Sequence, residues 1–136
     1  MIHDFAIKFR VTGKELIIYI VVYLTAGFIN NEIGKFFAIA EFRYWWQVLS
    51  CYGLYLIPVS LYLRDRSLPE QYVYGVFFLG ICELSGYTIG SSIAHPGNIF
   101  EQLFGPLNVS LAMSLVFAVI PPIGNTIVRT IRRILS

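Results

Sequence analysis

The amino-acid sequence predicts an all-α integral membrane protein with four transmembrane helices in an antiparallel bundle. Apolar and aromatic residues make up 57% of the 136 residues, whereas charged residues make up only 13%, about half their usual share in soluble domains. Four long apolar stretches lie between Lys14 and Arg129, and a membrane span needs about 20 such residues. We therefore expect residues 1–136 to form a single membrane domain.

Short polar connections separate the predicted spans. Thr12 and Glu15 have the spacing of a capping box, which indicates that a helix begins just before the first span. Pro69 follows a short charged turn and suits the first turn of the third helix. The spans are placed at 14–33, 45–63, 71–93 and 107–128.

Basic residues are distributed unevenly between the two ends of these spans. Of the ten lysines and arginines, only Lys35 and Arg43 lie on one side, and the other eight lie beside the two termini and the connection between the second and third spans. Short cytoplasmic connections are enriched in basic residues. Both termini are therefore predicted to be cytoplasmic, and we expect the protein in a bacterial inner membrane.

The segment 1–12 is too short to span a membrane. Its apolar residues fit both a helical stripe and the alternation of a strand, which periodicity alone does not distinguish. We favour a helix on the inner membrane surface, because Lys8 and Arg10 would then contact anionic lipid.

A second short segment lies between the third and fourth spans. Asn98 is a good helix-capping residue with Glu101 three positions later, and Gly105-Pro106 supplies a stop. A short interfacial helix over 98–104 is predicted, resting at the outer surface.

Glu83 is the strongest single indication of a site. It lies near the midpoint of the third predicted span, where an acidic side chain costs about 2.5–3.5 kcal/mol on insertion scales, so it should face the bundle interior. Gly86 and Gly90 follow on the same helical face and would allow close helix contact. Tyr52 and Ser114 lie at similar depth and are predicted hydrogen-bond partners of Glu83. As alternatives, Glu83 is a link between helices, a ligand anchor or the candidate catalytic residue.

Pro121 and Pro122 interrupt the hydrogen bonding of the fourth span. Neither proline can donate to the carbonyl four residues earlier, so the oxygens of Phe117 and Ala118 need other donors. Asn125, one turn away, is predicted to be one. A plain kink is favoured over the broken helix of a binding site.

Polar residues at the outer ends of the predicted elements form a further group. His95 and Glu101 are considered as an acid–base or metal pair, but their spacing matches no metal-ligand motif, so solvated loop residues are favoured. No metal or cofactor is predicted. The group comprises Asn30, Asn31, Glu32, His95 and Glu101.

Three functional classes fit these observations. We favour a non-catalytic accessory subunit, or a bundle that binds a hydrophobic ligand, other membrane subunits or a second copy of itself. The alternatives are an enzyme acting on a lipid or isoprenoid, with Glu83 or the His95/Glu101 pair as proton donor, and an oligomeric conduit lined by Glu83 and the Pro121-Pro122 break. The net charge of +2 is small and the basic residues flank apolar spans, which argues against nucleic-acid binding.

Overall fold

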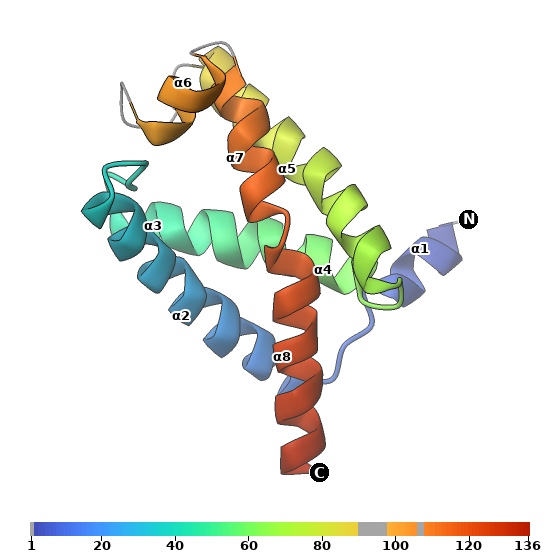
Figure 1. Cartoon of the computed structure of the whole chain (residues 1–136). Helices are drawn as coiled ribbons and strands as arrows, with labels where there is room; N and C mark the ends of the chain where they lie inside the picture. The colour runs from blue at the N-terminus through green and yellow to red at the C-terminus, as the bar shows by residue number, and fades with distance from the viewer. Residues whose placement is uncertain (1, 90–97, 106–107) are drawn as a thin grey trace.

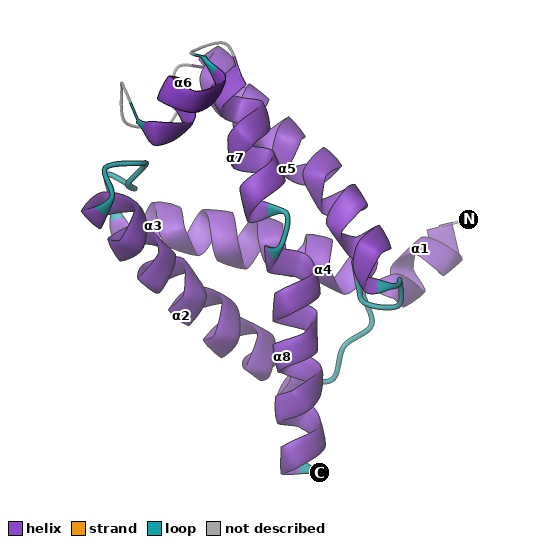
Figure 2. Ribbon diagram, in the orientation of Figure 1, coloured by secondary structure: helices purple, strands orange, loops and turns teal. Residues whose placement is uncertain are grey.

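The computed structural model describes residues 2–89, 98–105 and 108–136, and its regular elements in these ranges are helices (Figures 1 and 2). The predicted all-α class is confirmed for this part of the chain. The elements are α1 (Ile2–Lys8), α2 (Gly13–Phe36), α3 (Trp45–Val48), the π-helix η1 (Leu49–Leu56), α4 (Ile57–Leu63), α5 (Leu68–Ile89), α6 (Ile99–Phe104), α7 (Val109–Phe117) and α8 (Ile120–Leu135).

Three helical stretches are long and apolar enough to cross a membrane: Gly13–Phe36, Trp45–Leu63 and Leu111–Leu135. Large apolar side chains are exposed along them, including Leu54 at 80%. Such extensive apolar surface is costly in water, so these stretches suggest an integral membrane protein.

The observed helices also test the predicted span boundaries. The stretch Trp45–Leu63 coincides with the predicted span 45–63. The helix Gly13–Phe36 extends the span predicted at 14–33 by about one turn, and α8 continues past residue 128 as far as Leu135. The span predicted at 71–93 overlaps α5, and residues 90–93 lie outside the described residues.

The stretch Trp45–Leu63 contains a π-helix at its centre, which the sequence analysis did not predict. The amide of Ile57 donates to the carbonyl of Tyr52, the wider spacing of a π turn. Pro58 follows in the first turn of α4. It has no amide hydrogen, so it cannot donate the regular helical hydrogen bond to the carbonyl four residues earlier. Because π turns often occur at functional sites, the residues of η1 are of particular interest.

The predicted interruption near Pro121 and Pro122 is present. Helix α7 ends at Phe117, and α8 begins with the two prolines in its first turn (Figure 1), where a helix does not need their missing amides. The neighbouring helix α5 stabilises this break, because the Tyr72 hydroxyl donates to the carbonyl of Leu115 at 2.6 Å.

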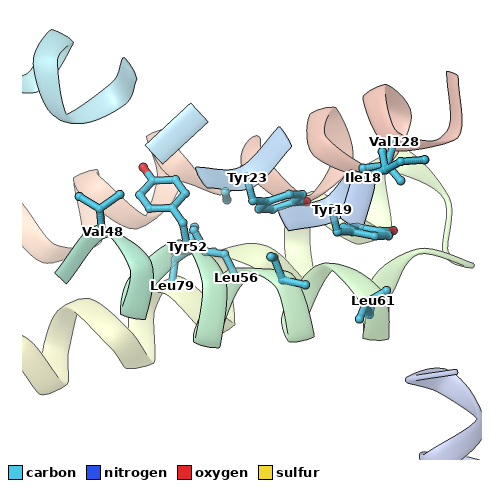
Figure 3. Packing of buried hydrophobic residues seen from close by; sticks show 11 residues of the cluster. Ile18, Tyr19, Tyr23, Val48, Tyr52, Leu56, Leu61, Leu79 and Val128 are labelled. Carbon is cyan, nitrogen blue, oxygen red and sulfur yellow. The ribbon is translucent and has the colours of Figure 1, made fainter. Parts of the chain in front are cut away.

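The helices share one core. Helix α2 packs against η1 and α8, whereas α5 packs against α7, α8 and α4, so that the stretch from α3 to α4 lies between α2 and α5 (Figure 1). Figure 3 shows Tyr19 and Tyr23 of α2 and Tyr52 of η1 among the residues of this core.

The three local helix predictions also have clear outcomes. The segment 2–8 is helical rather than extended, and 99–104 forms the short helix α6. Thr12 accepts a hydrogen bond from the amide of Glu15, and Asn98 likewise accepts one from the amide of Glu101. The Glu15 carboxylate does not complete the capping box; it pairs with arginines instead.

Candidate functional site: an apolar pocket around Glu83

A pocket of about 120 Å³ lies where α2, η1, α5 and α7 meet. Its lining is mainly apolar, with a small number of polar groups, and it borders the break between α7 and α8 because Phe117 and Ile120 both line it. The residues of greatest interest are Asn30, Tyr52, Leu79, Glu83, Met113 and Phe117.

Glu83 projects into this pocket from α5, one turn after the buried Leu79. The carboxyl group makes no hydrogen bond to Tyr52 or Ser114 within the part of the chain that the structure describes, contrary to expectation. Ser114 instead faces Gly80, where an added Cβ would lie 3.8 Å from its hydroxyl oxygen. The acidic group is therefore placed inside the bundle without the two partners predicted from depth alone.

The Tyr52 hydroxyl has a different partner. The side-chain amide of Asn30 donates to it at 3.3 Å, which joins α2 to η1 across the pocket wall. Gly27 permits this arrangement, because a Cβ at that position would lie 2.8 Å from the Tyr52 ring. The ring of Phe42 packs edge-on against Tyr52, with centroids 6.5 Å apart.

Of the polar group predicted at the outer ends, two residues reach the pocket. Asn30 and Asn31 both line it, and the Asn31 side-chain oxygen accepts a hydrogen bond from the amide of Phe42 at 2.7 Å. That bond holds the segment after α2 against the pocket. Glu32 is exposed and Glu101 is half-buried on α6, and neither lines the pocket.

Two predicted residues cannot be compared with the structure. His95 and Gly90 lie outside the described residues, so the His95/Glu101 pair and the close contact at Gly86 and Gly90 stay predictions. Among the residues that the structure does describe, no group of three or more histidine, cysteine and acidic side chains is arranged to hold a metal ion.

A buried polar network, unrecognised in the sequence, lies nearer the arginine-rich end. The Tyr19 hydroxyl donates to the side-chain oxygen of Asn125 at 2.6 Å, and the Asn125 amide donates to the Ser60 carbonyl and the Gln71 side chain, both at 2.9 Å. The Tyr23 hydroxyl donates to the Ser60 hydroxyl at 2.5 Å. The network thus joins α2, α4, α5 and α8.

Asn125 therefore has a different role from the one predicted. It was expected to donate to the carbonyls left free by the prolines, but both amide hydrogens are used at Ser60 and Gln71. The sequence contained one indication of the network: Tyr19 and Tyr23 are four residues apart in an apolar span, which places both hydroxyls on one face of the helix.

Comparison of the chain with models of protein families, with curated proteins and with solved structures found no match. The chemistry of the site therefore follows from its geometry. The wall is mainly apolar, and its Tyr52, Asn30 and Asn31 side chains already have hydrogen-bond partners, which leaves the Glu83 carboxyl to bind a molecule with an apolar body and one polar group.

Proposed function

We propose that the protein is a non-catalytic membrane bundle that binds a hydrophobic ligand in the pocket around Glu83. The observation that carries the proposal is the position of Glu83 on the wall of a mainly apolar pocket. An acidic group within a membrane-spanning bundle is costly, and a ligand with a matching polar group would compensate for that cost. Glu83 anchors the polar group, and the wall around Leu79 and Met113 contacts the apolar body.

The proposed topology has four spans with both termini in the cytoplasm. Helix α5 is the additional span, because its 22 residues rise by about 33 Å, enough for the hydrocarbon core of a bilayer. The orientation rests on the excess of arginine and lysine at one end of the bundle. The Glu83 pocket then lies in the outer half of the membrane, with α6 at the outer surface.

The size of the pocket limits the ligand. A cavity of about 150 Å³ lined by apolar side chains accommodates benzene, and the Glu83 pocket, at about 120 Å³, is slightly smaller. It therefore accepts a small ring that carries a polar substituent rather than a whole lipid.

The experiment compares what co-purifies with the protein from membranes in mild detergent. Mass spectrometry of the wild type is expected to detect one enriched hydrophobic compound. Glu83→Gln should reduce its amount about tenfold, because a hydrogen bond to a charged group contributes about 1.5–3 kcal/mol. Glu70→Gln is the matched control: Glu70 lies on the same helix, is exposed, and pairs only with Arg66 among the described residues.

Three outcomes would contradict the proposal. Equal amounts of the compound in wild type and Glu83→Gln would exclude Glu83 as the anchor. A stoichiometric protein partner with no enriched small molecule would favour an accessory subunit. Conversion of the compound by wild type and not by Glu83→Gln would make the protein an enzyme.

A further inference from the structure

A second cavity lies at the opposite end of the bundle from the Glu83 pocket. It has a volume of about 250 Å³ and is mainly polar. Helix α2, the turn between α4 and α5, and α8 line it. Its principal lining residues are Glu15, Tyr19, Arg64, Asn125, Arg129 and Arg132.

Positive charge predominates in this basic cavity. Three arginines line it against two acidic residues, Glu15 and Asp65, so one positive charge is left over. The Glu15 carboxylate lies 3.3 Å from Arg132 and 3.7 Å from Arg64, and only 11% of its side chain is exposed. Glu15 thus holds two guanidinium groups, from α8 and from the turn after α4, toward one point.

The arginines retain donors for a further anion. Arg64 also donates to the Arg10 carbonyl, and Arg129 donates weakly to the Arg64 carbonyl at 3.4 Å. Within the described residues, no carboxylate pairs with Arg129. Because each guanidinium carries several N–H donors, most of those that line the cavity are left for a ligand.

The inner wall of the basic cavity is closed by groups that already have partners. Tyr19 donates to Asn125, and Asn125 uses both amide hydrogens within the buried network. Leu56 and Tyr23, each 1% exposed, lie farther into the core. The cavity therefore ends at this wall and has the form of a binding site rather than the mouth of a passage.

We propose that the basic cavity binds a phosphate group through Arg64, Arg129 and Arg132. The planar fork of a guanidinium matches two phosphate oxygens at once, and three forks that converge from two elements favour a compact anion with several oxygens. The phosphate belongs either to the head group of an anionic phospholipid, which basic pockets between membrane helices bind, or to a soluble phosphate compound. This site is independent of the ligand proposed for the Glu83 pocket.

Two probes distinguish the sources. The first is phosphatidylglycerol, compared with zwitterionic phosphatidylcholine, with the bound lipid measured by native mass spectrometry of the protein in neutral detergent. The second is sodium phosphate, compared with sodium chloride at equal ionic strength, with binding measured as a rise in the melting temperature. Preference for phosphatidylglycerol alone supports the lipid source, whereas stabilisation by sodium phosphate supports the soluble source. The proposal fails if neither probe binds preferentially.

The variants test whether the cavity, and not the general charge of this end, holds the anion. Arg129→Gln and Arg132→Gln should each weaken binding of the effective probe about tenfold, since each removes charge-assisted hydrogen bonds. Arg133→Gln is the matched control, because Arg133 follows Arg132 on the same helix and is likewise exposed, but does not line the cavity. Equal loss in Arg133→Gln and Arg132→Gln would overturn the proposal.

A substitution of opposite effect keeps the test informative if the arginine variants fold poorly. Asp65→Asn removes a carboxylate that lines the cavity and leaves the pairs of Glu15 with Arg64 and Arg132 intact. The remaining positive charge in the cavity rises, so the effective probe should bind several-fold more tightly. Unchanged or weaker binding by Asp65→Asn would contradict an anion site at these arginines.

Discussion

Near the arginine-rich end, Asn125 makes three hydrogen bonds to groups on α2, α4 and α5. Toward the opposite end of the bundle, Glu83 lies on the wall of a mainly apolar pocket and bonds to neither Tyr52 nor Ser114 in the described part of the chain. Both regions place polar side chains inside the same bundle. They differ in whether the surrounding protein provides hydrogen-bond partners for those side chains.

This difference separates a structural role from a functional one. A buried polar group with all its partners supports one particular packing of the helices. A half-buried acidic group that lines a pocket without a matched partner lowers stability, and such groups in membrane helices commonly mark functional sites. The network around Asn125 therefore has its explanation within the fold, whereas we propose that Glu83 has its explanation in a ligand.

The largest expected effect is the loss of the network. Asn125→Leu would leave the Tyr19 hydroxyl, the Gln71 side-chain oxygen and the Ser60 carbonyl without this partner. Hydrogen bonds between membrane helices contribute about 0.6–1.7 kcal/mol each, so the free energy of unfolding should fall by about 2–5 kcal/mol. Titration with a denaturing detergent in mixed micelles measures it.

The matched control for this variant is Thr126→Ala. Thr126 is the next residue on α8, is exposed, and bonds to the Pro122 carbonyl of its own helix. Its replacement should change the free energy of unfolding by less than about 0.5 kcal/mol. If Asn125→Leu were no more destabilising than Thr126→Ala, the network would not stabilise the bundle.

A second variant tests how closely α2 and α8 approach beside the network. A Cβ at Gly124 would lie 2.2 Å from the Tyr23 hydroxyl, and the Tyr23 hydroxyl is held by Ser60. Gly124→Ala should therefore destabilise the protein by about 2–3 kcal/mol through overpacking, as measured by the same titration.

Gly53 of η1 provides the contrasting substitution. A Cβ there would meet the Leu24 side chain at 3.8 Å, an ordinary contact. Because alanine is favoured over glycine in helices by up to about 1 kcal/mol, Gly53→Ala should be neutral or slightly stabilising. Equal destabilisation by the two substitutions would mean that the close contact at Gly124 is absent.

The last expected effect is a gain of stability, opposite in sign to that of Asn125→Leu, and concerns Glu83. Glu83→Leu replaces an acidic side chain by an apolar one. Because the described part of the protein provides no matched hydrogen-bond partner for the acidic group, the ligand-free variant should gain about 1–2 kcal/mol of stability. The thermal melt of delipidated protein measures this gain, and the same variant should lose the co-purifying compound. A loss of stability as large as that of Asn125→Leu would show that Glu83 is a structural link, and the comparison between the two regions would fail.

Interactions between residues close together in the sequence were predicted correctly, whereas interactions between distant residues were not. The caps at Thr12 and Asn98 involve residues three positions apart and were predicted correctly. The bond between Tyr19 and Asn125 joins residues 106 positions apart, and no periodicity indicates it. The pairing of Glu83 with Tyr52 was inferred from equal depth, but depth does not specify the direction in which each side chain points.

The sequence by itself determined the helical class, the three stretches that are long and apolar enough to span a membrane, and the asymmetric distribution of arginine, because each depends on residues that are neighbours in the chain. Tertiary structure alone decided that Asn125 meets Ser60 and Gln71, that η1 presents Tyr52 to Asn30, and that Glu83 lines an apolar pocket. The rotation of each helix about its own axis is set by packing against the neighbouring helices. The amino-acid pattern along one helix does not specify which side chains those neighbours present.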